Sequence, residues 1–338
     1  MGEFELIRQF FTRPTPRAVL GVGDDCALLQ PSLDMQLAIS TDMLVAGRHF
    51  FADVDPRHLG HKALAVNLSD LAACGARPLA FTLALALPEV QEPWLGAFAD
   101  GLLALADTHG CELIGGDTTR GPLTICITVF GEVPAAPPAR TGALPTQALL
   151  RSNAQPGDDI WVSGTLGDAC LALQALQTPT ARDAPWLAQA RQRLECPTPR
   201  VALGLALRGV ASACADVSDG LLGDLGHILA RSAVGARVEA EVAMHLLAAY
   251  AYSTGSEGQF DTYFSIETVR RCVLHGGDDY ELVFTAPADQ RAQVHAAAQA
   301  SATPVTRIGC IEAAPGLRLV DAAGQPLPVA GASFDHFA

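Results

Sequence analysis

Apolar residues recur in the first half of the chain at spacings that predict both helices and strands. Between residues 57 and 74, Leu64, Leu68 and Leu71 lie three or four positions apart, as on one face of a helix. Other apolar stretches are shorter and typical of strands. The elements expected here are helices at 57–74 and 92–109 and strands at 36–40, 79–87 and 123–133, the first of which ends at Thr41 and Asp42.

A segment rich in proline and alanine, residues 133–147, separates this half from a second stretch in which strands and helices again alternate. Ser218 is expected to be the N-cap of a helix there. The mixed order predicts an α/β (mixed α+β) chain of two domains, residues 1–135 and 149–338. The second is expected to contain strands at 159–163, 211–217 and 280–286 and helices at 168–176 and 219–231.

Two adjacent aspartates, Asp24 and Asp25, follow a glycine turn in GVGDDCALLQ and lie between the apolar stretches 18–20 and 27–29. These stretches resemble interior sequence, so both carboxylates are expected near a core. Two carboxylates there would repel each other and lose hydration, at a cost of several kcal/mol per ion, unless a cation accompanies them. The stretch therefore indicates a bound positive charge.

Further aspartates lie at the ends of predicted elements, in glycine turns or within the helix 57–74. Taken singly, each is most simply a turn or cap residue, and Asn67 with Asp70 is as readily a solvated stripe as a ligand pair. Taken together, oxygen ligands without a Cys/His cluster suit Mg²⁺, and a polyphosphate bridged by several Mg²⁺ ions would account for so many acids. The residues concerned are Asp24, Asp25, Asp42, Asp70, Asp117, Asp216, Asp219, Asp278 and Asp279.

The charge balance narrows the expected partners. The 338 residues carry a formal net charge of -14, and Lys62 is the one lysine, so neither a nucleic acid nor an anionic membrane is expected to bind. An anionic substrate would have to be neutralised by arginines, backbone N–H groups or metal ions. The sequence has no P-loop motif, and its nine scattered cysteines form no Cys-x-x-Cys pair. Without a leader-like or membrane-spanning stretch, the protein is expected to be cytoplasmic.

Seven stretches resemble, in this order, the thiamine-monophosphate kinase family: GVGDDCALL, AISTDMLVAGRHF, KALAVNLSDLAACGA, LIGGDTTRGPL, DVSDGLLGDLGHI, GGDDYEL and FDHFA. The resemblance covers nearly the whole chain. It implies the fold of the aminoimidazole-ribonucleotide synthetase-like superfamily and the ATP-dependent phosphorylation of thiamine monophosphate to thiamine diphosphate. It also implies several Mg²⁺ ions and a homodimer formed through the sheet of the N-terminal domain, and it leaves a monovalent-cation requirement open.

The resemblance also implies roles for single residues. Residues expected to bind metal, directly or through water, are Asp25, Ser40, Thr41, Asp42, Asp70, Asp117, Asp216 and Asp219. Expected ATP contacts are Gly116, Asp117, Arg151 and Ser218, and the thiamine substrate is expected at His49, Asp278 and Phe334. Because the acceptor phosphate is already ionised, direct in-line transfer without a covalent phosphoenzyme is expected.

Two other functions stay open on the residues alone. One is a related ATP-dependent enzyme of the same superfamily, such as a selenophosphate or purine-pathway synthetase, with another acceptor. A selenophosphate synthetase would need a reactive cysteine and lysine near its N-terminus, whereas Cys26 lies in an apolar stretch and Lys62 is distant. The other is a non-catalytic ATP- and Mg²⁺-binding or maturation protein, which would hold nucleotide without turnover.

Overall fold

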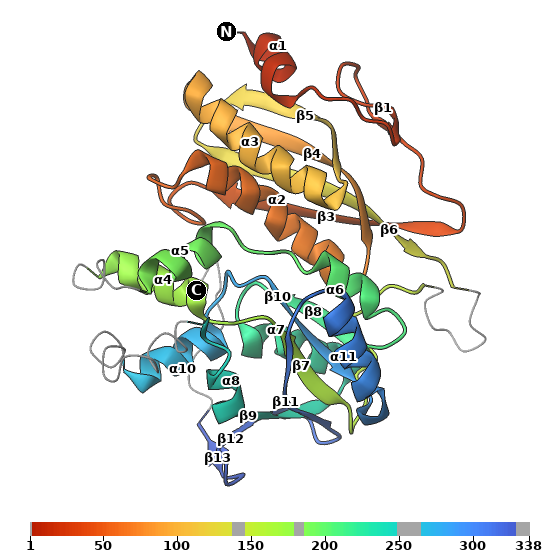
Figure 1. The fold of residues 1–338 in the computed structure, drawn as a ribbon, viewed down its shortest axis with the longest axis vertical. Coiled ribbons are helices and arrows are strands. Elements are labelled where there is room, and N and C mark those ends of the chain that lie inside the picture. Colours follow the sequence, from red (N-terminus) through yellow and green to blue (C-terminus); the bar gives the residue numbers. More distant parts are fainter. Residues whose placement is uncertain (1, 137–145, 179–185, 249–264, 329–338) are drawn as a thin grey trace. The chain divides into compact units, whose positions relative to one another are not determined.

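The computed structural model describes four segments of the chain, residues 2–136, 146–178, 186–248 and 265–328. The chain divides into two compact units, each built from a sheet and helices (Figure 1). The mixed α/β class with two domains is therefore confirmed. Unit 1 comprises Met1–Leu71 and Ala76–Ala148, and unit 2 comprises Ala72–Gly75 and Leu149–Ala338.

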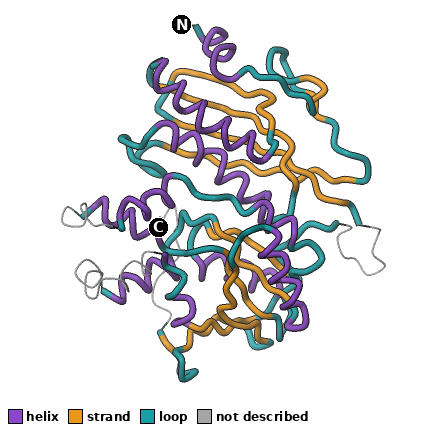
Figure 2. Tube along the Cα trace, in the orientation of Figure 1, coloured by secondary structure: helices purple, strands orange, loops and turns teal. Residues whose placement is uncertain are grey.

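Unit 1 is built on a four-stranded sheet with the strand order β3-β6-β4-β5. β6 pairs antiparallel with both β3 and β4, whereas β4 and β5 are parallel. Two helices, α2 (Pro56–Ala73) and α3 (Glu92–His109), cover one face of this sheet (Figures 1 and 2). The strands are β3 (Met35–Val45), β4 (Arg77–Leu87), β5 (Glu112–Arg120) and β6 (Thr124–Pro134).

The two faces of the sheet in unit 1 differ in exposure because side chains alternate along each strand. Leu83 of β4 and Ile127 of β6 are paired in register and are 5% and 1% exposed, since they face the helices. On β3, Leu37, Ile39 and Met43 point the other way and are 44%, 59% and 54% exposed. We call the side of the sheet that carries these three residues the open face.

Strand β3 is longer than the sequence predicted. It pairs with β6 along its whole length, from Met35 opposite Pro134 to Val45 opposite Thr124. Thr41 and Asp42 consequently lie within the strand, and the prediction that the strand ends there is wrong. Hydrogen bonds to β6, which lies about 85 residues further along the chain, hold the polar half of β3 extended. The spacing of apolar residues within β3 does not indicate so distant a partner.

The N-terminal segment forms two short helical turns, α1 (Glu3–Leu6) and the π-helical η1 (Ile7–Phe11), followed by a ribbon of β1 (Ala18–Leu20) and β2 (Leu28–Leu29). One side of the ribbon packs on Leu79, Ala80 and Ile114 of the sheet. The other side exposes Val19, Leu20 and Leu28. The expectation that the stretches flanking Asp24 and Asp25 are interior is thus wrong for half of their side chains, because a two-stranded ribbon has only one side to bury.

Unit 2 contains a seven-stranded sheet with the order β13-β12-β9-β11-β7-β10-β8. All neighbouring strands are antiparallel except β12 and β9. β7, β8 and β10 at one end of this order are fully buried along their lengths. The strands are β7 (Asp159–Ser163), β8 (Ala213–Val217), β9 (Gly235–Glu239), β10 (Glu281–Ala286), β11 (Val305–Glu312), β12 (Gly316–Val320) and β13 (Pro326–Leu327).

Both helices predicted in unit 2 are present, one with a later start, and the other helical elements of this unit were not predicted. The helix expected from 219 begins at Leu221, and its N-cap is Gly220 rather than Ser218. Ser218 therefore does not have its predicted capping role. The helical elements are α4 (Asp168–Gln177), α5 (Leu187–Glu195), α6 (Val201–Ala206), α7 (Leu221–Ser232), α8 (Ala240–Met244), α10 (Ile266–His275), η3 (Ala288–Gln290) and α11 (Arg291–Ala300).

Two general features agree with the sequence. All nine cysteines are free thiols, so no disulfide framework holds either unit together. Within the described segments, no helix combines the length and the apolar character that crossing a bilayer requires.

One buried carboxylate on β7 forms ion pairs with residues of β11 and α11. Asp159 of β7 is 2% exposed in its side chain and forms ion pairs with Arg291 and Arg307, each at 2.5 Å. Burial alone would raise the pKa of Asp159, but the hydrogen bonds and charges of the two arginines outweigh it and lower the pKa below its ordinary value. The ionised form of Asp159 therefore stabilises the folded chain.

Replacing Asp159 should change how the free energy of unfolding depends on pH. Because the pKa is lower in the folded chain than the ordinary 3.8, the stabilisation is present above pH 3.8 and is lost as the pH falls through the folded-state pKa. At neutral pH, Asp159→Asn should lower the free energy of unfolding by about 1–3 kcal/mol. Urea unfolding at a series of pH values should show this difference shrinking in acid, and a difference that stays constant would contradict the assignment.

Candidate functional site

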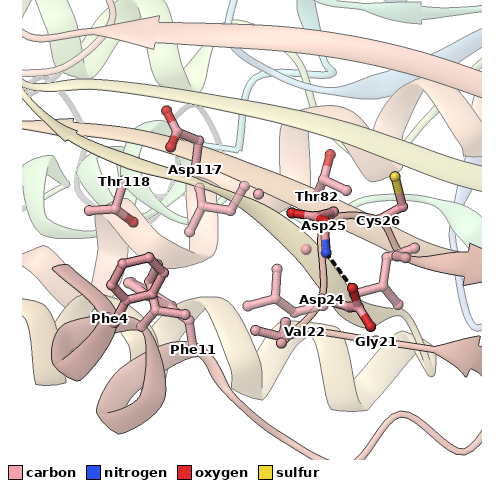
Figure 3. Close-up of a pocket in the computed structure, with 18 of the residues that line it drawn as sticks. Phe4, Phe11, Gly21, Val22, Asp24, Asp25, Cys26, Thr82, Asp117 and Thr118 are labelled. Atoms are coloured by element: carbon pink, nitrogen blue, oxygen red, sulfur yellow. Dashed lines mark hydrogen bonds between the residues drawn. The ribbon is translucent and has the colours of Figure 1, made fainter.

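A cavity of about 570 Å³ lies in unit 1, along the outer edge of strand β5 (Figure 3). Its walls differ in chemistry. Phe4, Ile7 and Phe11 of the N-terminal helical turns form an apolar wall, while the turn at residues 21–27 and the strand segment 115–118 supply backbone and acidic groups. Figure 3 shows Phe4 and Phe11 on one side of the cavity and the turn with Asp24 and Asp25 on the other.

The structure brings three of the predicted site residues, Asp25, Gly116 and Asp117, to this one cavity. Asp24, Asp25 and Asp117 are exposed, so the first acidic pair, which was expected near a core, keeps access to solvent. Within that pair, the Asp25 backbone N–H donates to the Asp24 carboxylate at 2.9 Å. GGDTTRG was open to interpretation as a simple turn, but it continues β5 up to Arg120.

Gly116 is required by the close approach of two strands. Its φ is +148°, and a Cβ atom at this position would lie 1.8 Å from the Leu83 carbonyl oxygen of β4. The glycine therefore allows β5 to pair with β4 and leaves backbone rather than a side chain on the cavity wall. Asp117, the next residue, is paired with Ala84 and belongs to the open face, with its carboxylate at the cavity.

A second polar group lies between β3 and α2. The Ser40 hydroxyl donates to the Asp70 carboxylate, and the Asp42 backbone N–H donates to the Asn67 amide oxygen at 3.1 Å. Asn67 is only 1% exposed. The alternative that Asn67 and Asp70 form a solvated stripe is therefore wrong, because this face of α2 lies against β3.

Alternation along β3 separates the three neighbouring residues that the family resemblance grouped as metal ligands. Ser40 and Asp42 lie on the helix side of the sheet, whereas Thr41 lies on the open face. The Thr41 hydroxyl is 2.9 Å from the Thr128 hydroxyl, its register partner on β6. The side chain of Thr41 therefore does not join the group formed by Ser40, Asp42 and Asp70.

His49 has a structural contact in the same unit. The Val45 backbone N–H donates to His49 Nδ1 at 3.0 Å, and Lys62 Nζ lies 3.5 Å from the His49 carbonyl oxygen. This bond fixes the ring against the end of β3 and identifies Nδ1 as the acceptor. Phe334, the other aromatic residue expected at the substrate, lies outside the described residues.

In unit 2, the predicted residues Ser218, Asp219 and Asp278 lie on two loops that pack back to back. The Asp278 backbone N–H donates to the Ser218 carbonyl oxygen at 2.9 Å. A Cβ atom at Gly277 would lie 2.3 Å from that same oxygen, so only glycine allows this approach. Asp278 and Tyr280 have positive φ angles of 68° and 52°, the kind of strain that persists where surrounding contacts enforce it.

The sequence motifs assign no role to Asp224, although this residue organises the first of these loops. Its buried carboxylate accepts hydrogen bonds from the backbone N–H groups of Ser218 and Asp219, both at 3.1 Å. Burial and the nearby Asp219 carboxylate raise the pKa of Asp224 to about 6, while the two backbone hydrogen bonds and the charge of Arg151 oppose this. Of the predicted ATP contacts, Arg151 thus has its charge near Asp224. Asp216, in buried strand β8, precedes that loop.

Strand β10, which follows Asp278, is anchored by buried charge. Glu281 is fully buried and forms ion pairs with Arg193 at 2.8 Å and Arg200 at 2.5 Å. Asp279, next to Asp278, accepts a hydrogen bond from the Gly167 backbone N–H at 2.7 Å, and its Oδ1 atom has no partner among the described atoms. These contacts hold the start of β10 in one position.

The donor chemistry of the candidate ligands fits Mg²⁺, because all are carboxylate or hydroxyl oxygens. In the parts of the chain that the structure describes, no three His, Cys, Asp or Glu side chains converge closely enough to hold a metal ion by themselves. Mg²⁺ commonly binds through one or two carboxylates together with water and substrate phosphates. The spacing of Asp25 and Asp117 around an open cavity suits that mode of binding.

The fold and these sites define a member of the AIR synthase related proteins. The family model for the N-terminal domain of these proteins matches residues 23–133, and the model for the C-terminal domain matches residues 155–322. Within this class, the chain belongs to the thiamine-monophosphate kinase family, and it is an enzyme of the phosphotransferase class. It is 45% identical to the thiamine-monophosphate kinase of Salmonella typhimurium strain LT2, over 100% of this chain and 98% of that protein.

Solved structures agree with this membership. The crystal structure of the thiamine-monophosphate kinase from Stenotrophomonas maltophilia K279a matches with a TM-score of 0.78 and 47% identity, over 94% of both chains. AaThiL complexed with AMPPCP and TMP matches with a TM-score of 0.73 and 26% identity, over 91% of this chain and 89% of that chain. The family resemblance carried by the seven sequence motifs is confirmed.

Replacing Asp224 tests its role in holding the loop of Ser218 and Asp219. Asp224→Ala leaves two backbone N–H groups without their acceptor and should lower the free energy of unfolding by about 1–3 kcal/mol. Asp224→Asn keeps an acceptor oxygen and removes the buried charge, so it should lose less stability than the alanine variant. Urea unfolding of both variants measures this order, and an alanine variant as stable as the wild type would refute the role.

Proposed function

We propose that the protein transfers the γ-phosphoryl group of ATP to the phosphate of thiamine monophosphate and forms thiamine diphosphate. The observation that carries the proposal is the cavity along β5, where the separate stretches at residues 23–25 and 115–117 meet. It is supported by 45% identity to a thiamine-monophosphate kinase over the full chain. A related structure, AaThiL, is complexed with AMPPCP and TMP.

The nucleotide is assigned to the cavity in unit 1. Its volume of about 570 Å³ lies within the usual range of about 300–1,000 Å³ for small-molecule pockets. The apolar wall of Phe4, Ile7 and Phe11 suits a purine base, and the wall with Asp25 and Asp117 suits metal-bound phosphates. The bare peptide at Gly116 lets a phosphate approach the backbone closely.

The residues assigned to Mg²⁺ are Asp25 and Asp117 at the cavity, Ser40, Asp42 and Asp70 between β3 and α2, and Asp216 and Asp219 in unit 2. Thr41 is assigned to Mg²⁺ apart from Ser40, Asp42 and Asp70, because its side chain lies on the open face of the sheet, as that of Asp117 does. When bound, Mg²⁺ supplies the positive charge that offsets the repulsion between the carboxylates and the polyphosphate.

The side chains of this chain position the reactants. Thiamine monophosphate brings an ionised phosphate as the nucleophile, so no side chain has to remove a proton and no residue has to carry a covalent phosphoryl group. Arg151 and Ser218 are assigned to ATP, and His49, Asp278 and Phe334 to the thiamine substrate. The hydrogen bond from Asp278 to the Ser218 carbonyl oxygen couples two of these residues in unit 2.

A product assay tests the proposal. The purified protein is given ATP, Mg²⁺ and either thiamine monophosphate, thiamine or no acceptor, and thiamine diphosphate and ADP are measured separately. Thiamine diphosphate should form only from the monophosphate and only with Mg²⁺. Asp117→Asn and Asp42→Asn should lower kcat/KM by at least about 100-fold, as expected for loss of a metal ligand.

The matched control is Asp34→Asn, which removes an exposed carboxylate in the same unit at a left-handed position that asparagine tolerates. It should keep wild-type activity. Formation of ADP without thiamine diphosphate, or tight nucleotide binding without turnover, would contradict the proposed acceptor and revive the alternatives of another acceptor or a binding role.

We also propose that two copies of the chain pair through the open face of unit 1. Leu37, Ile39 and Met43 form an apolar row on β3 that is about half exposed, and contiguous apolar surface of this kind marks interaction sites. β3 is also the outermost strand of its sheet. A second copy with the same apolar row would cover both surfaces symmetrically.

Ile39→Glu should convert the dimer into a monomer, because it places a charge in the centre of this surface. Light scattering coupled to size-exclusion chromatography measures the mass, and the monomer is 35.3 kDa. Val90→Glu is the matched control, since Val90 is 46% exposed but lies beyond the end of β4. A dimer that survives Ile39→Glu, or a monomeric wild-type protein, would contradict this interface.

A further inference from the structure

Two cysteines far apart in the sequence lie in contact in unit 2. Cys170 is in the first turn of α4, and Cys272 is in the second half of α10. The two helices that carry them pack against each other. The side chain of Gln174, one turn after Cys170, lies across both sulfurs, with its Nε2 atom 3.4 Å from Cys170 Sγ and 3.3 Å from Cys272 Sγ.

The backbones that carry the two thiols are also close. A Cβ atom at Gly276 would lie 2.5 Å from Cys170 Cβ and 3.0 Å from Cys170 Sγ. A Cβ atom at Gly167, just before α4, would lie 3.0 Å from the carbonyl carbon of Cys272. A disulfide needs Cα atoms about 4.4–6.8 Å apart. Both distances show that the first turn of α4 is packed against the end of α10, the two elements that a disulfide between Cys170 and Cys272 would join.

The two thiols differ in reactivity. Hydrogen bonding from the Cys272 side chain lowers the pKa of Cys170 below its ordinary value. Gln174 and the charge of Arg271 act in the same direction, while burial and the nearby Asp278 carboxylate oppose it. The same hydrogen bond, together with burial, raises the pKa of Cys272. Cys170 is half-buried and near the N-terminal end of α4, whereas Cys272 is fully buried. Cys170 is therefore the thiol that reacts first, and Cys272 is placed to resolve the product.

We propose that Cys170 and Cys272 form a dithiol modification site at which a hydroperoxide produces an intramolecular disulfide. The Cys170 thiolate attacks the peroxide, so that an S–O bond forms and the O–O bond breaks. With hydrogen peroxide the leaving group is hydroxide, which takes up the proton of the original thiol and becomes water. The sulfur of Cys272 then attacks Cys170 Sγ, and an S–S bond replaces the S–O bond. The departing hydroxide takes the Cys272 proton, so that two thiols and one peroxide give one disulfide and two waters.

The site does not depend on the proposed kinase reaction, because neither cysteine is assigned to ATP, metal or thiamine. The site is close in sequence to residues assigned to the kinase reaction, because α10 is followed directly by the stretch Gly276–Asp278, which packs on Ser218. Its chemistry is therefore tested by mapping the disulfide rather than by measuring activity. A failure of the kinase assay would leave this test intact.

Tryptic mapping of the full-length protein tests the proposal. Cys170 lies alone among cysteines in the peptide 152–182, and Cys272 lies alone in 272–291. After treatment with hydrogen peroxide and alkylation of the remaining thiols, the main cysteine product should be these two peptides joined and lighter by two hydrogens. Reduction with dithiothreitol should separate them again.

Three variants sharpen the test. Cys272→Ser should abolish the link and leave a Cys170 sulfenic acid that dimedone traps, whereas Cys170→Ser should leave Cys272 as an unmodified thiol. Cys310→Ser, a control at a half-buried cysteine on β11, should form the link as the wild type does. Oxidation of wild-type Cys170 to a sulfinic acid without the linked peptide, or peroxide reacting first with Cys26 while Cys170 stays reduced, would overturn the proposal.

Discussion

Repulsion between negative charges is the constraint on which the rest of the structure depends. The cavity along β5 brings Asp24, Asp25 and Asp117 to one surface, in a chain of net charge -14 with a single lysine. A polyphosphate entering this cavity meets like charge, and near a protein surface each close pair of like charges costs several kcal/mol. A divalent cation that is coordinated by both the carboxylates and the polyphosphate turns this repulsion into a net attraction. On the proposed function, the acidic residues and the phosphorylated ligands are complementary only through metal.

The scaffold meets this constraint by fixing backbone rather than by burying charge. Gly116 lets β5 pair closely with β4 and places Asp117 at the cavity edge. Gly277 lets the loop of Asp278 rest on the Ser218 carbonyl oxygen, and Asp224 holds the amides of that loop. The fully buried charges are used differently. The carboxylates of Asp159 and Glu281 are each paired with two arginines and brace the sheet of unit 2.

Local patterns predicted the elements that depend on local contacts. The helices α2 and α3 and the buried strand β7 were placed within one or two residues, because their apolar spacing reflects a single buried face. β3 was cut short because it depends on a partner strand distant in sequence, and Ser218 was misassigned as a cap because Gly220 takes that position. Asp224 escaped notice since a lone aspartate in a helix carries no signal of the amides it accepts from. The family, in contrast, followed from seven ordered motifs, which no single residue could have indicated.

The claim that metal makes this acidic cavity a nucleotide site is tested most directly by the binding of AMPPCP to the intact protein. Isothermal titration calorimetry with and without Mg²⁺ would measure the affinity in both states, for the wild type and for Asp25→Asn. We expect tight binding with Mg²⁺, binding at least about 100-fold weaker when EDTA removes it, and a smaller metal dependence in the variant. Equal affinity with and without Mg²⁺ would show that the carboxylates serve another purpose.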